Sequence, residues 1–366
     1  MTGNIIGERF VVVSFGESHG KCVGAVIDGC PAGLELSEAD IQSELDLRRP
    51  GVSRVASPRA EEDRVEILSG IFEGRTTGSP ICMLVWNRDI DSEPYRMFVN
   101  RPRPGHADYV ARVKYGGFAD WRGSGRFSGR ITAGLVMAGA VAKKLLSKTL
   151  GVEIMAYALE IGGIRAKNFT LDDIRSKRYN NEVRCPDEAA ANEMIKRINE
   201  VKEQGDSLGG IVECQVLGLP VGLGEPIFSA LDSDLSKALF AIPAVKGVEF
   251  GAGFAAARLL GSQNNDPYTI VDGKVVTVTN NAGGVLGGIS TGMPLVVRVA
   301  FKPPSSIAKK QTTVDLSSMK ETEIEVKGRH DPTVVPRAVP VVEAVVAIVL
   351  ADHAIRAALI PPVLRG

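Results

Sequence analysis

With 366 residues, the chain is long enough for a large core, and length alone would allow two or three domains. Its 43 Lys and Arg residues balance 43 Asp and Glu residues, which argues against a general nucleic-acid binder with its usual basic excess. Five cysteines without a C-x-x-C spacing, one of which would stay unpaired, argue against a disulfide scaffold and favour free thiols in a reducing cytoplasm.

The first half of the chain predicts a mixture of helices and strands. A helix fits residues 37–47, with Ser37 as its N-cap and Asp40 three residues later in the manner of a capping box. A long, mostly buried helix fits residues 130–150, which contain few helix breakers. Apolar and β-branched runs predict five strands: 10–15, 23–28, 65–72, 80–86 and 152–161.

The second half continues the mixture. Charges alternate at helical spacing over residues 187–203, which predicts a solvated helix. Asp272-Gly273 stands between two β-branched runs and predicts a hairpin over residues 268–278. Further helices are predicted at 229–240, at 250–260 and from 335 onward, and further strands at 211–217, 294–301 and 322–326.

The apolar stretch 334–359 is interrupted by prolines and charged residues, so it predicts a buried core helix rather than a membrane span. The N-terminus lacks a basic region followed by an apolar one, so no signal peptide is expected. No segment has the composition of a linker. We therefore expect residues 1–366 to form a single α+β domain, with two sheets around central helices, and no membrane partner.

Three of the four histidines lie in short segments rich in glycine, arginine and acidic residues: Gly16-Glu-Ser-His-Gly20, Arg103-Pro-Gly-His-Ala-Asp108 and Gly328-Arg-His-Asp331. Gly or Pro beside histidine indicates a loop, and arginine binds phosphate or carboxylate with two parallel hydrogen bonds. We expect these loops to converge on one polyanionic site. His353 lies in an apolar stretch and is expected to be a packing residue.

The stretch Arg122-Gly-Ser-Gly-Arg-Phe-Ser-Gly-Arg130 leads into the long helix predicted at 130–150. Because helix N-termini attract anions, this basic loop favours contact with phosphate or a cofactor, although it is neither a Rossmann fingerprint nor a P-loop. A surface turn with solvated arginines is the alternative. Arg48-Arg-Pro-Gly51 with Arg54 is, on its own, an ordinary basic helix end, and Lys302-Pro-Pro-Ser-Ser306 is either a ligand contact or a turn.

The histidine positions limit the chemistry. No His-x-x-x-His or comparable spacing exists, so no metal site is expected. Ser18 and His19 are adjacent, and adjacent residues seldom align as nucleophile and base. The chemistry left for the histidines is proton transfer or the stabilisation of charge.

Taken together, these segments resemble the chorismate synthase family from about residue 5 to residue 358. Eight ordered motifs carry the resemblance: Phe15-Gly-Glu-Ser-His-Gly20, Asp28-Gly-Cys-Pro-Ala-Gly33, Arg48-Arg-Pro-Gly51, Arg103-Pro-Gly-His-Ala-Asp108, Asp206-Ser-Leu-Gly-Gly210, Val245-Lys-Gly-Val-Glu-Phe-Gly251, Asn281-Ala-Gly-Gly-Val-Leu-Gly-Gly288 and Gly328-Arg-His-Asp-Pro332.

The resemblance implies a lyase that converts 5-enolpyruvylshikimate-3-phosphate to chorismate by 1,4-anti-elimination of phosphate, the last step of the shikimate pathway to aromatic amino acids. It implies reduced FMN as cofactor, although the reaction is redox-neutral overall. It also implies a β-α-β sandwich with central helices between antiparallel sheets, assembled as a cytoplasmic homotetramer. Since no appended reductase domain is recognisable, an external flavin reductase is the expected partner, with NADPH as an indirect reductant.

Roles of single residues follow from the matched motifs. His19 would protonate or neutralise the departing phosphate, and His106 would stabilise or protonate the reduced flavin. Asp331, with Ser18 and Ser128 as relays, would manage the proton at flavin N5. The substrate-binding arginines implied are Arg48, Arg54, Arg103, Arg130 and Arg329, and the family's nicotinamide phosphate site also falls on Arg48 and Arg54. FMN contacts are implied for Arg126, Phe127, Ser128, Pro243, Ala244, Gly287, Lys302, Pro303, Pro304, Ser305, Ser306 and Arg329.

One segment departs from the family. The common pattern Ser-Ser-Ala-Arg-Glu-Thr-Ala is replaced by Phe127-Ser-Gly-Arg-Ile-Thr-Ala133. Phe127 removes a hydroxyl and Ile131 replaces an acid, so we expect flavin contacts at residue 127 to come from the backbone or from ring stacking. A changed flavin affinity would follow more readily than a changed reaction.

Two other functions compete with this assignment. A nicotinamide-dependent oxidoreductase is disfavoured because no strand–G-x-G-x-x-G–helix unit is present. An RNA-binding protein is disfavoured because the net charge is zero and only two Trp and six Tyr are present for base stacking. Whether the chain itself reduces FMN with NADPH stays open.

Overall fold

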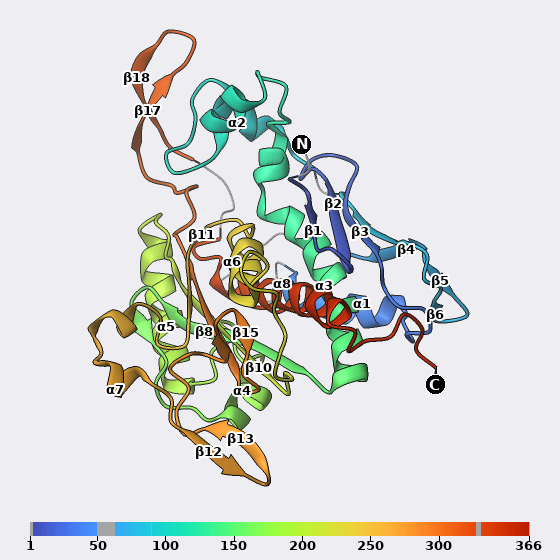
Figure 1. The fold of residues 1–366 in the computed structure, drawn as a ribbon. Coiled ribbons are helices and arrows are strands. Elements are labelled where there is room, and N and C mark those ends of the chain that lie inside the picture. Colours follow the sequence, from blue (N-terminus) through green and yellow to red (C-terminus); the bar gives the residue numbers. More distant parts are fainter. Residues whose placement is uncertain (1–2, 50–62, 89, 327–330, 366) are drawn as a thin grey trace.

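The computed structural model describes residues 3–49, 63–88, 90–326 and 331–365 (Figure 1). The predictions made for Arg54, Arg329 and His330 lie outside the described residues. Two antiparallel five-stranded sheets and the long helices near them account for most of the fold. The chain is therefore an α+β protein, as predicted.

The first sheet is built from the N-terminal part of the chain, and each neighbouring pair of strands is antiparallel. Its strands, in spatial order, are β1 (Ile5–Ile6), β2 (Val11–Gly16), β3 (Cys22–Asp28), β7 (Ile81–Trp86) and β4 (Val65–Ser69). Val23, Ala25 and Ile27 alternate along β3 and are all buried, because successive side chains of a strand point to opposite faces. This face is the one that contacts the helices.

The second sheet comes from the middle and C-terminal parts of the chain and is also antiparallel. Its strands, in spatial order, are β11 (Val245–Phe250), β16 (Leu295–Phe301), β10 (Gly210–Leu217), β8 (Glu153–Ile161) and β9 (Ile164–Arg165). Along β16 the burial alternates strictly, with Leu295, Val297, Val299 and Phe301 buried. The second sheet thus also has one apolar face.

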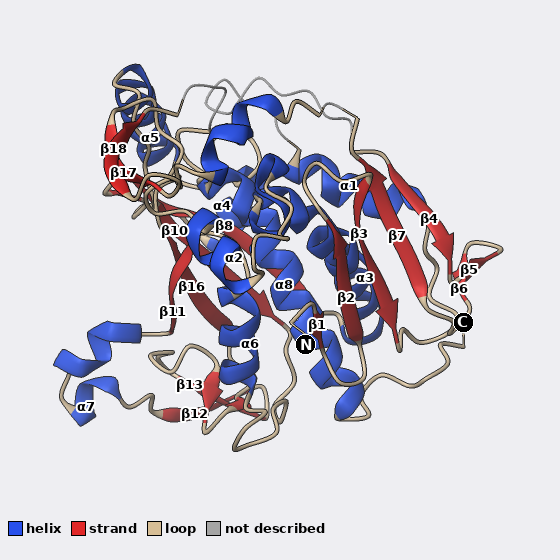
Figure 2. Ribbon diagram, turned by 90° about the horizontal axis from the view of Figure 1, so that it is seen from above, coloured by secondary structure: helices blue, strands red, loops and turns tan. Residues whose placement is uncertain are grey.

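Helices α3 (Thr132–Leu150) and α8 (Val335–Arg356) pack against each other and against the two sheets. α3 contacts β3, α8 contacts β8 and β10, and Figure 2 shows both helices between the sheets. Gly139 permits the close crossing, since a Cβ there would lie 2.2 Å from the Cβ of Ala344. Helices α1 (Glu38–Arg48) and α6 (Leu231–Phe240) both pack on α8.

Helix α8 is long and apolar enough to cross a membrane by composition. However, 94% of its most apolar window is buried inside the fold. This is the burial of a core helix, which is what the interrupted sequence predicts.

The remaining elements are short or peripheral. They are β5 (Ile71–Phe72), β6 (Arg75–Thr76), the 3-10 helix η1 (Glu93–Val99), α2 (Asp108–Lys114), the 3-10 helices η2 (Arg122–Phe127) and η3 (Gly129–Ile131), α4 (Leu171–Lys177), α5 (Glu188–Glu203), the 3-10 helix η4 (Gly253–Arg258), α7 (Gly261–Asn264), β12 (Tyr268–Val271), β13 (Lys274–Thr277), β14 (Val285–Leu286), β15 (Ile289–Ser290), β17 (Gln311–Asp315) and β18 (Lys320–Ile324).

Three predicted elements are wrong in part. The strand predicted at 65–72 is broken at Gly70, whose φ of +87° ends β4 and starts the hairpin β5–β6. The helix predicted at 250–260 is the end of β11 followed by the 3-10 helix η4, since Gly251 and Gly253 both have φ of +53°. The strand predicted at 322–326 begins earlier, at Lys320, because it pairs with β17, which was not predicted.

All five cysteines are free thiols, as expected, and Cys30, Cys185 and Cys214 are buried. His353 is buried, as predicted for a packing residue. Its Nε2 also lies 3.0 Å from Oδ2 of Asp234 on α6, so it joins two helices by a polar contact.

Candidate active site

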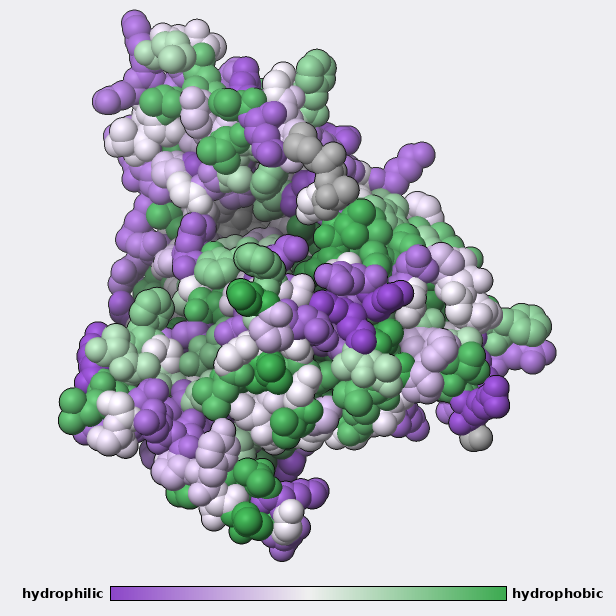
Figure 3. Space-filling view, in the orientation of Figure 1, coloured by the Kyte–Doolittle hydropathy of each residue, from purple (hydrophilic) through white to green (hydrophobic). Residues whose placement is uncertain are grey.

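A cavity of about 840 Å³ opens between the part of the molecule that carries α2 and β17–β18 and the body below it. The surface is visibly hollowed there (Figure 3). The lining comes from loops far apart in sequence, which the two sheets and α3 bring together. The predicted residues that line it are Ser18, His19, Arg103, His106, Arg126, Phe127, Ser128, Arg130, Pro243, Ala244, Lys302, Pro304, Ser305, Ser306 and Asp331.

Three described residues with predicted site roles are not part of the lining. Arg48 lies behind it and is 1% exposed. Pro303 follows β16 between two residues that do line the cavity. Gly287 lies in the turn between β14 and β15, away from the cavity of this chain.

His19 is held from several sides after β2. Its Nδ1 lies 2.9 Å from Oγ of Ser92, and its ring packs edge-on against Tyr95 with centroids 5.2 Å apart. The backbone of Gly123 lies close to Cδ2 of the ring. A side chain at this position would collide with the imidazole, because a Cβ there would lie 2.2 Å from Cδ2 of His19. The imidazole is therefore fixed at the cavity wall, with little freedom to rotate.

The glycine- and arginine-rich loop has an unusual backbone. Gly123, Ser124 and Gly125 have φ of 56°, 71° and 51°, so three successive residues are left-handed inside η2. This path lets Ser124 Oγ accept a hydrogen bond from Nη2 of Arg103 at 2.8 Å. Ser128 then caps the turn that leads into α3, since its Oγ accepts from the backbone N–H of Arg130 at 3.2 Å.

His106, Asp108 and Arg103 form a compact charged group. Nδ1 of His106 lies 2.7 Å from Oδ1 of Asp108, and Arg103 donates to both carboxylate oxygens at 2.8 Å. Burial alone would raise the pKa of Asp108, but the hydrogen bonds and positive charges of Arg103 and His106 hold that pKa well below its usual value. Asp108 is thus a permanent carboxylate that orients the imidazole.

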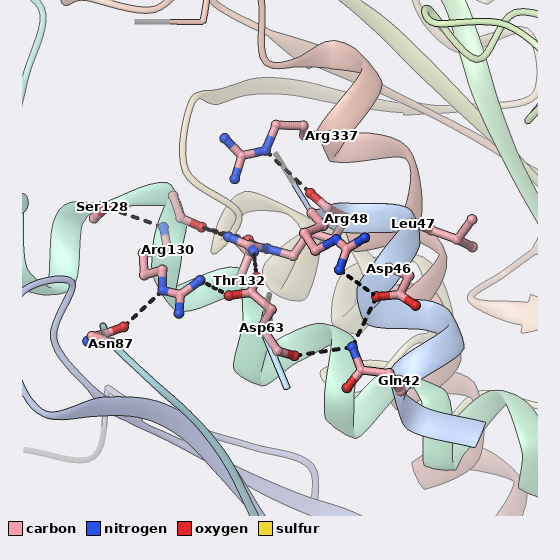
Figure 4. A network of polar contacts seen from close by, with 12 residues as sticks. Gln42, Asp46, Leu47, Arg48, Asp63, Asn87, Ser128, Arg130, Thr132 and Arg337 are labelled. Carbon is pink, nitrogen blue, oxygen red and sulfur yellow. Dashed lines mark hydrogen bonds and ion pairs between the residues drawn. The ribbon is translucent and has the colours of Figure 1, made fainter. Parts of the chain in front are cut away.

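Arg130 and Arg48 share one buried carboxylate, Asp63 (Figure 4). Arg48 donates to Oδ2 of Asp63 at 2.9 Å, to Oγ1 of Thr132 at 2.9 Å and to the carbonyl of Gly129 at 3.2 Å. Arg130 contacts Oδ1 of the same carboxylate. Two guanidinium groups thus meet at one buried carboxylate beside the cavity.

Two further cationic side chains, Arg126 and Lys302, line the cavity. Arg126 donates to the carbonyl of Gly16 at 2.9 Å and to Oδ1 of Asn4 at 2.9 Å, which ties η2 to the first sheet. Burial lowers the pKa of Lys302, and the charge of nearby Lys246 lowers it further. Lys302 Nζ donates to Oγ of Ser305 at 2.9 Å.

Asp331 stands at the start of the last helix, where Arg337 donates to its Oδ2 at 2.7 Å. The same arginine donates from Nε to the carbonyl of Arg48 at 3.4 Å. Arg337 thus joins the predicted proton carrier to the end of α1. It lines the cavity and was not predicted from the sequence.

Asp63, Asn87, Ser92 and Ser124 were also missed. Asp63, Asn87 and Ser92 are single polar residues outside the motifs, whereas Ser124 lies inside the stretch 122–130 but was given no role there. The role of each depends on which distant loop the fold brings beside it. Arg337 carried a weak signal, because it is a charged residue in the first turn of a mostly apolar helix.

Comparison with known proteins identifies the family. The family model described as chorismate synthase matches residues 10–355. The chain belongs to the chorismate synthase family. A relative named chorismate synthase from Korarchaeum cryptofilum is 60% identical over 356 residues, covering 97% of this chain and 98% of the relative. One from Dehalococcoides mccartyi is 57% identical over 362 residues, covering 99% of each.

A solved structure is similar as well. A crystal structure of chorismate synthase superposes with a TM-score of 0.75 at 34% sequence identity and covers 96% of this chain and 93% of that chain. As a member of the chorismate synthase family, the chain is a carbon–oxygen lyase that acts on a small-molecule phosphate ester in the shikimate pathway to aromatic amino acids.

Proposed function

We propose that the chain converts 5-enolpyruvylshikimate-3-phosphate to chorismate by 1,4-anti-elimination of phosphate, with reduced FMN as its cofactor. The observation that carries the proposal is one cavity of about 840 Å³ lined by His19, His106 and a set of cationic side chains. The substrate bears a phosphate and two carboxylates, and such a set of donors matches several anionic groups in one place. A ring C–H bond and the C–O bond to phosphate break, and a new double bond forms.

The donors present also fit a flavin phosphate and ring system. Lys302, Ser305 and Ser306 would hold anionic oxygens, while Arg126 would support the loop beside them. Phe127, with 37% of its surface exposed, offers the ring contact predicted for this departure from the family pattern. When bound, the reduced flavin supplies electron density to the reacting ring.

The residues of this chain then have separate tasks. His19 gives a proton or a positive charge to the leaving phosphate, and Arg130 binds anionic oxygens of the substrate. His106, oriented by Asp108, donates toward the flavin. Asp331, held by Arg337, accepts and passes on a proton through Ser18 and Ser128.

The wider arrangement belongs to the same proposal. One apolar core joins residues of both sheets and of α3 and α8, which supports a single domain with the order of a β-α-β sandwich. Large apolar side chains are exposed between residues 227 and 275, among them Phe228 at 94%, Ile227 at 80% and Ile270 at 72%. Together with the hairpin β12–β13, which projects from the body (Figure 1), they support burial in a homotetramer. We place the enzyme in the cytoplasm. There an external flavin reductase would supply it with reduced FMN, and NADPH would be the indirect source of electrons.

An anaerobic assay with 5-enolpyruvylshikimate-3-phosphate tests the function, with chorismate absorbance and phosphate release as the readouts. Parallel reactions contain chemically reduced FMN, oxidised FMN, or oxidised FMN with NADPH. Turnover with reduced FMN alone is expected, and turnover with NADPH would add an intrinsic reductase. No turnover in any reaction, from folded protein that binds FMN, would contradict the proposal.

The two histidines provide the residue-level test. His19→Ala and His106→Ala should each slow turnover by about 10²- to 10⁴-fold, the usual contribution of a positioned acid or base. Wild-type rates in both variants would show that neither imidazole takes part.

A further inference from the structure

Asn87 stands directly after β7 and uses its side-chain amide to hold two distant segments. Its Oδ1 accepts a hydrogen bond from Nε of Arg130 at 3.0 Å. Its Nδ2 donates to the carbonyls of Glu17 at 3.0 Å and Gly20 at 2.9 Å. A neutral amide carries one acceptor oxygen and an NH₂ group with two donors, so both polar atoms of Asn87 have defined partners.

The segment on the donor side is the turn that carries His19. The turn is closed by a hydrogen bond from the backbone N–H of Gly20 to the carbonyl of Glu17 at 3.0 Å. Ser92 and Tyr95 hold the ring of His19, whereas Asn87 holds the backbone on both sides of it. Loss of the Asn87 side chain would leave the ring contacts and the backbone bond that closes the turn, but would remove the support of the carbonyls on both sides of His19.

The segment on the acceptor side is the start of α3, through Arg130. Asp63 already places one carboxylate against this guanidinium. Asn87 offers this guanidinium a neutral acceptor, so it helps to orient Arg130 without itself adding negative charge.

We propose that Asn87 is a positioning residue that fixes the His19 turn and the Arg130 guanidinium relative to each other, so that both act on the phosphate of the substrate. This inference rests on the proposed function for the identity of the anion. It gives Asn87 no contact with the reacting atoms, and its effect passes through the two residues that it holds.

Asn87→Asp is the sharpest variant, because the side chain keeps its shape while two donors are lost and a carboxylate is placed beside Arg130. Calorimetry with inorganic phosphate on the flavin-free protein should show a Kd raised about 10-fold or more, since a neutralised cation binds anions less well. With 5-enolpyruvylshikimate-3-phosphate and reduced FMN, kcat should fall about 10²-fold, as expected for a displaced catalytic group. Asn87→Ser shortens the side chain, removes the contact with Arg130 as well as the two donor contacts, and introduces no charge, so it replaces Asn87→Asp should the latter not fold.

A double-variant cycle separates positioning from simple loss of stability. Because part of the effect of Asn87 passes through His19, Asn87→Ser should lower kcat by a clearly smaller factor in the His19→Ala background than in the unmodified protein, with the remaining loss passing through Arg130. Losses that multiply in full would overturn the inference. Unchanged phosphate affinity and kcat in both Asn87 variants would overturn it too.

Asn181→Asp is the matched control. Its amide also holds a turn, donating to the carbonyl of Cys185 at 2.6 Å and accepting from the N–H of Cys185 at 3.1 Å, but it does not line the cavity. Its kcat and phosphate affinity should equal those of the unmodified chain. Absence of turnover in the unmodified protein would refute the proposed function, whereas the phosphate affinities would still decide the role of Asn87.

Discussion

At the scale of single residues, Asp108 shows how burial and charge decide what a side chain does. Its side chain is 11% exposed and contacts both Arg103 and His106. These partners hold the pKa of Asp108 below that of the unfolded chain, against the effect of burial, so the unfolded state binds a proton at a higher pH than the folded state. The contribution of Asp108 to stability is therefore present above about pH 3.9, the unfolded value, and is lost as the pH falls below it.

Asp108→Asn tests this sign. The variant should be less stable than the unmodified protein near neutral pH, and the difference should shrink as the pH falls below about 4. Urea unfolding followed by circular dichroism between pH 2 and pH 7 measures it. Glu93→Gln serves as the control, because Glu93 pairs with Arg96 on the surface and should change stability little at any pH. A constant difference for Asp108→Asn across the whole range would contradict the assignment.

The functional role of a residue could be predicted from the sequence only where the residue lies in a motif. His19, His106 and Arg103 stand in glycine-rich segments, and the structure places all three at one cavity. Asp63 stands after two glutamates in a charged stretch, with no feature that separates a buried counter-ion from a solvated acid. Its importance comes from Arg48 and Arg130, which meet it only in the folded chain.

At the scale of elements, the loop formed by η2 and η3 shows why glycine is required at one position and tolerated at another. Gly123 has a φ of +56°, and a Cβ there would overlap the ring of His19. Gly129 has open space around its missing Cβ and no left-handed backbone. Both lie in one loop, so they form a matched pair.

Gly123→Ala should destabilise the protein by about 1–2 kcal/mol from backbone strain alone, because an L-residue there must be left-handed. It should also displace His19 and lower kcat by about 10²-fold or more, toward the loss expected for His19→Ala. Thermal unfolding and steady-state turnover measure the two effects. Gly129→Ala should leave the melting temperature unchanged, and equal melting temperatures for both variants would rule out the strain.

Helix and strand positions followed well from periodicity where an element is long and packs on a core. The predicted helices at 37–47 and 130–150 correspond to α1 (Glu38–Arg48) and α3 (Thr132–Leu150). The short strand β17 escaped prediction because Gln311–Asp315 is mostly polar and gains its partner only through the hairpin with β18. The local sequence pattern of a strand does not reveal that it will pair with another strand when the pairing depends on that partner.

At the scale of the whole molecule, a buried carboxylate connects the layers. Glu343 lies in the middle of α8 with a fully buried side chain. It accepts from the backbone N–H of Ala156 on β8 at 2.8 Å and pairs with Lys143 of α3 at 2.8 Å. Nζ of Lys143 also donates to Oε1 of Glu44 on α1 at 2.8 Å. One chain of contacts thus runs from the second sheet through both central helices to α1.

Glu343→Gln should therefore weaken the packing of the whole fold rather than of one element. The amide oxygen can still accept from Ala156, but Lys143 loses its fully buried partner and keeps only Glu44. Breaking a buried pair costs up to about 3–5 kcal/mol. For a chain of this length, a loss of that size lowers the melting temperature by roughly 4–6 °C. Glu44→Gln removes the other partner of Lys143, which is 21% exposed, and should cost about 1 kcal/mol or less. Differential scanning calorimetry compares the two variants, and equal shifts would show that the buried carboxylate does not bind the layers together more strongly than the outer one.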